Sequence, residues 1–164
     1  MFYLAYGSNM SGPRLFARIP GARKLGRARV PGYRLHFHKV GDGDGTGKCD
    51  AYATGNKDDE LYGVVYEVPK GDIGTLDRIE GVGHGYRRQT IEVFLDGNEK
   101  KIAHTYIATR TDSNLKPLQW YKEHVLRGAR ENELPAAYIA AIDAVEAIAD
   151  PDPARDRRER EIYR

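Results

Sequence analysis

The stretch that organises this chain reads Phe2-Tyr3-Leu4-Ala5-Tyr6-Gly7-Ser8-Asn9-Met10-Ser11-Gly12-Pro13. Its run of uncharged apolar and aromatic residues predicts a strand buried on both faces, which the Gly-Ser-Asn cluster ends. Pro13 suits the first turn of a helix because its missing N–H needs no partner there, and Ser11 or Gly12 can cap that helix. A strand, a tight loop and a helix start bring backbone N–H groups together, which favours a bound carboxylate or a developing oxyanion.

The length and the cysteine content point to one reduced domain. The 164 residues are enough to bury a core of their own. The single cysteine, Cys49, cannot form an internal disulfide, so a cytoplasmic location is expected. We expect neither secretion nor membrane insertion, because no stretch resembles a signal peptide or approaches roughly 18 uninterrupted apolar residues.

Charge is unevenly distributed along the chain. Residues 1–40 hold eight Lys or Arg and no Asp or Glu, although the net charge is only +2. Such a block could steer an acidic small molecule or a nucleic acid, or it could be a solvated face. The basic side chains lack the interleaved aromatic residues of a base-stacking surface, so no nucleic-acid partner is expected. The role of the basic residues between positions 14 and 39 stays open.

Alternating residues predict a strand over 30–40, whose polar face carries His36 and His38. Two histidines on one strand face could ligate a metal, but further ligands at a recognisable spacing are missing, so no metal site is expected. The Gly/Asp-rich segment 41–47 lacks the glutamate of a calcium loop, since the twelfth position is Ala53. It predicts a hairpin tip that could also cover a site.

The rest of the chain predicts alternating strands and helices. Hydrophobic periods and turn residues indicate a helix over 13–19, strands over 50–54, 61–68, 86–95 and 101–109, a helix opened by Pro117, and a helix over 136–149. Residues 1–149 are expected to form the domain. Residues 150–164 are almost entirely charged after two prolines, which predicts a mobile or surface-helical tail.

One carboxylate occupies an unusual place in the pattern. Ile73, Leu76 and Glu80 recur at a helical spacing, so Glu80 falls on the apolar face of a short helix that Gly81 ends. Burial and the negative end of the helix dipole should raise the pKa of Glu80 toward that of a working acid or base. The alternative is a glutamate that reaches solvent from a frayed helix end.

Two motifs together resemble those of the γ-glutamylcyclotransferase family. They are Tyr6-Gly7-Ser8-Asn9-Met10, and Leu76-Asp77-Arg78-Ile79-Glu80-Gly81-Val82 followed by Gly85-Tyr86. The resemblance implies an α+β fold, with a mainly antiparallel barrel-like sheet flanked by helices. It also implies that Glu80, the glutamate before glycine, is the catalytic acid/base. The substrate contacts that it implies are Tyr3, Leu4, Ala5, Tyr6, Gly7, Ser8 and Tyr121, and we expect Asn9 to join them.

The resemblance continues toward the C-terminus through Tyr106, Tyr121 and residues 128–135, and it covers nearly the whole chain. Two departures concern the side of the leaving group: Glu133 stands where the animal-type relatives tend to carry glycine, and the loop at 109–116 looks different. Asn9 is similar to the main family rather than to its glutathione-specific relatives, which carry leucine there.

Other catalytic templates fit poorly, since no Gly-x-Ser-x-Gly motif, phosphate loop or cysteine signature is present. The family reaction instead uses the substrate's own α-amine, which attacks the γ-glutamyl carbonyl and releases 5-oxoproline with a free amine. We expect no cofactor, a small γ-glutamyl substrate, and a monomer or homodimer. Two alternatives stay open: a γ-glutamylamine cyclotransferase for ε-linked lysine or a biosynthetic γ-glutamyl group, and a non-catalytic domain that binds a small ligand.

Overall fold

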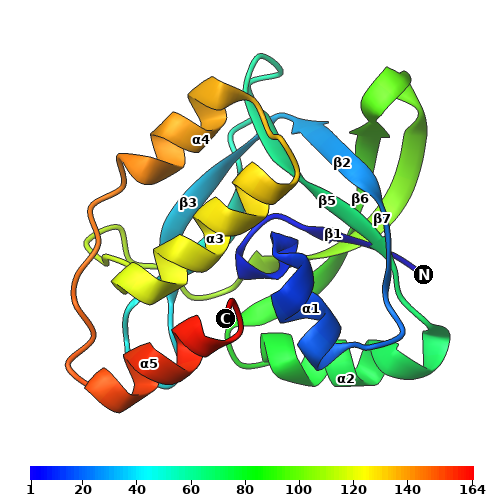
Figure 1. The fold of residues 1–164 in the computed structure, drawn as a ribbon. Helices are drawn as coiled ribbons and strands as arrows, with labels where there is room; N and C mark the ends of the chain where they lie inside the picture. Colours follow the sequence, from blue (N-terminus) through cyan, green and yellow to red (C-terminus); the bar gives the residue numbers. More distant parts are fainter.

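The computed structural model describes all 164 residues, and a closed five-stranded barrel forms its centre (Figure 1). The barrel strands, in their spatial order, are β1 (Phe2–Ala5), β5 (Glu60–Glu67), β2 (Arg23–Pro31), β6 (Tyr86–Leu95) and β7 (Lys100–Ala108). Neighbouring strands are antiparallel, except that β1 closes the barrel beside β7 in parallel, with Tyr3 opposite His104. The expected α+β fold with a mainly antiparallel barrel is therefore confirmed.

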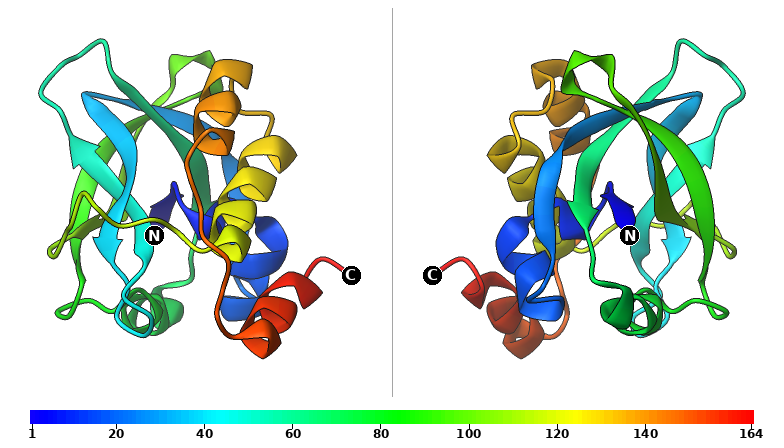
Figure 2. Two further views of the ribbon diagram at one scale, coloured as in Figure 1. Left: turned by 90° about the vertical axis from the view of Figure 1, so that its left-hand side faces the viewer. Right: turned by 90° about the vertical axis from the view of Figure 1, so that its right-hand side faces the viewer.

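A separate two-stranded ribbon stands beside the barrel (Figure 2). It consists of β3 (Tyr33–Val40) and β4 (Gly47–Ala53), which are antiparallel neighbours. The Gly/Asp-rich segment is the tip between them, as predicted, and Asp44 holds it by accepting from the backbone N–H of Thr46 at 2.9 Å and from Lys48 at 2.9 Å.

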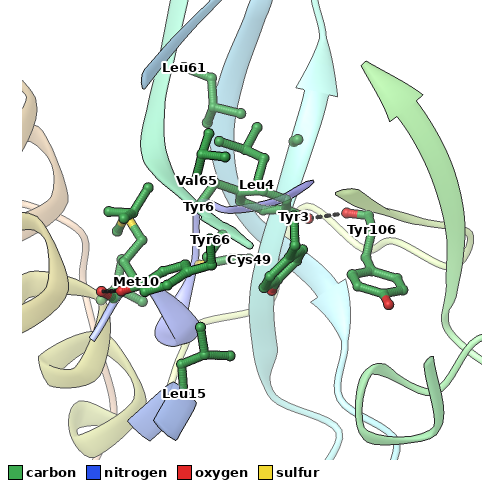
Figure 3. Close-up of a cluster of buried hydrophobic side chains, with 14 of the residues drawn as sticks. Tyr3, Leu4, Tyr6, Met10, Leu15, Cys49, Leu61, Val65, Tyr66 and Tyr106 are labelled. Carbon is green, nitrogen blue, oxygen red and sulfur yellow. Dashed lines mark hydrogen bonds between the residues drawn. The ribbon is translucent and has the colours of Figure 1, made fainter. Parts of the chain in front are cut away.

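The opening strand is buried as its sequence predicts, because β1 pairs on both edges and packs on both faces. Leu4 and Ala5 are essentially inaccessible to solvent. Figure 3 shows Leu4 among the core side chains that also include Met10, Leu15 and Tyr66. The Tyr66 hydroxyl donates to the carbonyl of Met10 at 2.9 Å, which ties the loop after β1 to the barrel wall.

The helices flank the barrel (Figure 1). They are α1 (Gly12–Arg18), α2 (Ile73–Glu80), α3 (Gln119–Glu131), α4 (Ala136–Asp143) and α5 (Pro153–Glu161). Helix α3 packs closely on the loop after β1, where the amide of Asn132 donates to the carbonyl of Met10 at 3.2 Å. Gly128 permits this approach, because a Cβ there would lie 2.6 Å from Met10. None of these helices has the length and apolar content needed to cross a membrane.

Three features of the fold differ from the prediction. The strand expected over 30–40 is the end of β2, a turn at Gly32 with φ of +83°, and then β3. β2 itself was not predicted, because its exposed half is basic and its bulge near Gly26 breaks the alternation. The helix expected over 136–149 ends at Asp143, and the backbone of Ile148 instead pairs beside Leu118.

The charged C-terminal segment is a docked surface helix. Asp152 caps α5 by accepting from the backbone N–H groups of Ala154 and Arg155. From this helix, Glu159 pairs with Arg14 at 2.7 Å. The hydroxyl of Tyr163, just beyond α5, lies 2.5 Å from Nδ1 of the buried His124. Of the two expectations for this tail, the surface helix is the one observed.

Candidate active site

A small pocket of about 290 Å³ opens where the loop after β1 meets the C-terminal end of α2. Its lining is rich in tyrosine and contains one carboxylate. The lining residues are Tyr3, Tyr6, Gly7, Ser8, Asn9, Cys49, Glu80, Tyr86, Tyr106 and Tyr121. Tyr3, Tyr6, Cys49 and Tyr106 also belong to the buried core cluster drawn in Figure 3, so the pocket adjoins that core.

Glu80 is the last residue of α2, and Gly81 ends the helix in the left-handed conformation, with φ of 69° and ψ of 44°. Its Oε1 accepts from Nδ2 of Asn9 at 2.6 Å, a contact between residues 71 positions apart. Burial raises the pKa of Glu80, while Arg18, Arg14 and the Asn9 amide oppose that rise. This direction is the one that the sequence predicts, and burial is its largest cause.

The loop after β1 carries unpaired backbone donors beside this carboxylate. Residues Ser8–Met10 form a single 3₁₀ turn, closed by the Met10 N–H donating to the Gly7 carbonyl at 3.0 Å. No acceptor within the chain pairs with the backbone N–H of Gly7, Ser8 or Asn9. Gly7 packs tightly, since a Cβ there would lie 2.9 Å from Cβ of Cys49. Three free donors on a lining loop suit a bound anion or a polarised carbonyl.

Backbone groups of neighbouring strands fix the tyrosine hydroxyls of the pocket by hydrogen bonds. The hydroxyl of Tyr86 donates to the carbonyl of Cys49 at 2.5 Å, while that of Tyr121 accepts from the Cys49 N–H at 3.0 Å. The hydroxyl of Tyr6 donates to the backbone carbonyl of Tyr106. Burial raises the pKa of Tyr6, Tyr86 and Tyr121 well above the ordinary value, so these phenols stay neutral.

Seven of the predicted site residues line the pocket together: Tyr3, Tyr6, Gly7, Ser8, Asn9, Glu80 and Tyr121. Leu4 and Ala5 do not, because both are buried in the barrel core, where the carbonyl of Leu4 accepts from Thr105 at 3.0 Å. The site prediction lacked Cys49, Tyr86 and Tyr106. Tyr86 and Tyr106 lie within the segments that carry the family resemblance, whereas nothing in the sequence marks Cys49.

The lining cysteine is not a nucleophile. Cys49 is buried, and burial raises the pKa of its thiol to about 12. A thiol with such a pKa holds almost no thiolate at neutral pH, and thiolate is the reactive form.

Of the two histidines on the ribbon, His38 makes a structural contact with an aspartate, whereas His36 packs against the rings of His38 and Tyr52. Nε2 of His38 lies 2.7 Å from Oδ2 of Asp50, and the other oxygen of Asp50 accepts from the backbone N–H of Ala108 at 2.8 Å. Asp50 thereby joins the ribbon to β7. No group of three or more His, Cys, Asp and Glu side chains is arranged to hold a metal ion.

The basic block of the N-terminal region is largely paired with acidic side chains. The ion pairs are Arg14–Glu159, Arg23–Glu67, Arg27–Asp96, Arg29–Glu60 and Arg34–Asp59. A surface whose cations already have carboxylate partners gives weak electrostatic steering, which favours the solvated-face interpretation of the block.

The fold and the pocket define the class, a small barrel enzyme of the AIG2-like type, and residues 60–142 match the model of the AIG2-like family. The human protein named gamma-glutamylcyclotransferase is 31% identical over 152 residues, which cover 88% of this chain and 78% of the human protein. The mouse protein of that name is 33% identical over 153 residues. A solved gamma-glutamyl cyclotransferase structure superposes with a TM-score of 0.89 at 27% identity, covering 99% of this chain and 98% of that one. The chain belongs to the γ-glutamylcyclotransferase family, and the resemblance seen in the sequence is confirmed.

Proposed function

We propose that the protein is a γ-glutamylcyclotransferase that releases 5-oxoproline and a free amino acid or amine. The observation that carries the proposal is the position of Glu80, whose carboxylate lies 2.6 Å from the Asn9 amide beside a loop with unpaired N–H groups. A single acid/base next to fixed donors suits an acyl transfer in which the substrate supplies its own nucleophile. The relatives that bear this activity in their names are consistent with it.

The loop would hold the glutamyl part of the substrate. The free N–H groups of Gly7, Ser8 and Asn9 would be the donors for a carboxylate or for the developing oxyanion. The neutral tyrosines around the pocket exclude water and give the folded substrate chain a rigid wall. No cation lines the pocket, so an anion would be held by neutral donors, which include these backbone N–H groups and the Ser8 hydroxyl.

The reaction balances without a cofactor. The α-amine attacks the γ-carbonyl carbon, the new C–N bond closes a five-membered lactam, and the amide C–N bond to the leaving amine breaks. Glu80 takes a proton from the α-ammonium and returns it to the departing nitrogen, and both protons that the α-nitrogen loses end on the released amine. A raised pKa suits a carboxyl group that must act as base and then as acid.

A direct assay tests the proposal. The purified protein, without added metal or nucleotide, is incubated with a panel of γ-glutamyl dipeptides and γ-glutamyl amines, including ε-linked γ-glutamyl-lysine, and 5-oxoproline is measured. The α-linked isomers of the same dipeptides serve as substrate controls, because their closure to the lactam would not release the second amino acid. Product from at least one γ-linked compound supports the proposal, and no product from any of them would favour the binding-domain alternative.

A further inference from the structure

A second arginine stands behind the pocket without an acidic partner. Arg18, in the last turn of α1, is half-buried and forms no ion pair with any carboxylate. Its Nη1 instead donates to Oδ1 of Asn9 at 2.9 Å. Arg14, one turn earlier on the same helix, is by contrast paired with Glu159 at 2.7 Å. Partial burial of a guanidinium costs free energy. A contact with a neutral amide offsets less of that cost than an ion pair does, unless the charge also acts on another group.

The amide of Asn9 links this arginine to Glu80. Its Oδ1 accepts from Arg18, and its Nδ2 donates to Oε1 of Glu80 at 2.6 Å and toward the hydroxyl oxygen of Tyr3 at 3.2 Å. A guanidinium can only donate hydrogen bonds, so it fixes which end of the amide is the oxygen. With Arg18 in place, the NH₂ end of Asn9 must face the carboxylate.

The amide also sets the distance between the cation and the carboxylate. A guanidinium in direct contact with a carboxylate lowers its pKa by roughly one to three units, which would leave a poor base at neutral pH. With one amide between them, the charge of Arg18 acts on Glu80 at longer range. Burial still raises the pKa of Glu80, although Arg18 opposes the rise.

We propose that Arg18 is a positioning residue for Glu80, which orients the Asn9 amide and limits the cost of ionising the carboxylate. This inference rests on the proposed function for its effect on turnover, but the geometry of the Arg18–Asn9–Glu80 chain does not depend on the substrate. A residue that orients a site residue through a hydrogen bond can affect activity as strongly as some residues that contact the substrate directly.

Other charged or titratable groups face Glu80 from the surrounding elements, and they also influence its ionisation. They are Arg14 of α1, Lys39 of β3, and the pocket residues Tyr3, Tyr6, Cys49, Tyr86, Tyr106 and Tyr121. Among the cations, Arg14 is paired with Glu159 and Lys39 with Asp42, the latter at 3.2 Å. Among these cations, we therefore expect the loss of Arg18 to change the ionisation of Glu80 most.

The first test reads the carboxyl group without any substrate. Protein labelled with [δ-¹³C]glutamate is titrated by NMR, and the Glu80 resonance is assigned by its absence in Glu80→Gln. Replacing Arg18 with leucine should raise the titration midpoint of Glu80 by about one pH unit. Arg18→Lys, which keeps a charged donor, should stay near the wild-type midpoint. Arg23→Leu is the matched control, since Arg23 is exposed and pairs with Glu67 elsewhere on the barrel.

The second test measures turnover over a range of pH. In Arg18→Leu, kcat should fall about tenfold or more, and the acid limb of kcat/KM should move upward with the NMR midpoint. Arg18→Gln keeps a hydrogen-bond donor but not the charge. It should retain more of kcat than Arg18→Leu does, while the acid limb of its kcat/KM profile still moves upward. If Arg18→Leu does not fold, Arg18→Gln takes its place in both experiments. A Glu80 midpoint in folded Arg18→Leu or Arg18→Gln equal to that of wild type would overturn the inference. Absent 5-oxoproline release by wild type would overturn the proposed function and leave the NMR test decisive.

Discussion

Replacing Glu80 by glutamine separates a catalytic carboxylate from a structural one. Glutamine has nearly the same shape, and its amide oxygen can still accept the hydrogen bond that Asn9 donates at 2.6 Å. What the variant loses is the capacity to take up and return a proton. General acid–base contributions of this kind are worth about 100-fold or more in rate, close to 3 kcal/mol in the activation free energy. We therefore expect kcat to fall by at least about 100-fold, with KM little changed.

The effect on stability should be small and of a definite sign. The pKa of Glu80 is raised in the folded protein, so the folded state binds this proton more tightly than the unfolded chain does. Stability is then greatest at low pH and declines as pH rises through the folded-state pKa. Glutamine does not ionise, so the variant should equal or slightly exceed wild type at pH 7, and this advantage should vanish near pH 4. Loss of a charge-assisted hydrogen bond limits the gain to about 1 kcal/mol, or roughly 2–4 °C in Tm for a chain of this length.

The measurement combines 5-oxoproline release with thermal unfolding on one preparation, at pH 4 and pH 7. Glu92→Gln is the matched control, because Glu92 is exposed on β6 and contacts only Lys100 at 3.2 Å. A folded Glu80→Gln protein with near-normal turnover would refute the acid/base assignment. A lowered Tm, with activity reduced only in proportion to the folded fraction, would show that Glu80 is structural.

Three further predictions concern the loop, the barrel and the C-terminal helix. Gly7→Ala should lower kcat/KM of the folded protein by about tenfold or more and also lower Tm, because the new Cβ would lie 2.9 Å from Cβ of Cys49 at the pocket wall; unchanged kinetics would contradict the role of the loop. Gly63→Ala should cost about 1–3 kcal/mol in urea unfolding, since its Cβ would lie 2.5 Å from the carbonyl oxygen of Ala5. His124 and Arg14 hold the pKa of Glu159 at about 2, so its stabilising contribution is present above about pH 4.5 and is lost as pH falls toward 2. Urea unfolding at pH 7 and pH 3 should accordingly show a smaller pH dependence for Glu159→Gln than for wild type.

The parts of the fold that could be predicted are those in which local pattern and tertiary packing agree. The apolar run before Gly7 forms β1, and the spacing that leads to Glu80 forms α2, which Gly81 ends in a left-handed turn. Both signals lie within about ten residues of sequence, so no knowledge of the rest of the chain is needed. The raised pKa of Glu80 follows from the same local pattern, because an apolar helix face implies burial.

The parts that could not be predicted depend on distant partners. β2 has few apolar residues, and Leu25 within it is 44% exposed, so its sequence resembles a basic loop. It becomes a strand because β5 and β6 supply hydrogen bonds on both of its edges. Cys49 lines the pocket for a similar reason, since its backbone N–H on β4 donates to the hydroxyl of Tyr121 on α3, which is 72 positions away in the sequence.

The closure of the barrel explains why Glu80 and the loop after β1 meet although 71 residues separate Asn9 from Glu80. β1 lies between β5 and β7, so the loop after it is held at one end of the barrel, and α2, which follows β5, ends at the same place. Bringing together residues so far apart in the sequence costs chain entropy, and the barrel strands that hold the two segments offset that cost. We therefore expect the contact between Asn9 and Glu80 to depend on an intact barrel. Variants that weaken the β1–β5 pairing, such as Gly63→Ala, should lose activity and global stability together, whereas variants of Arg18 should change the titration of Glu80 in a barrel that is still closed.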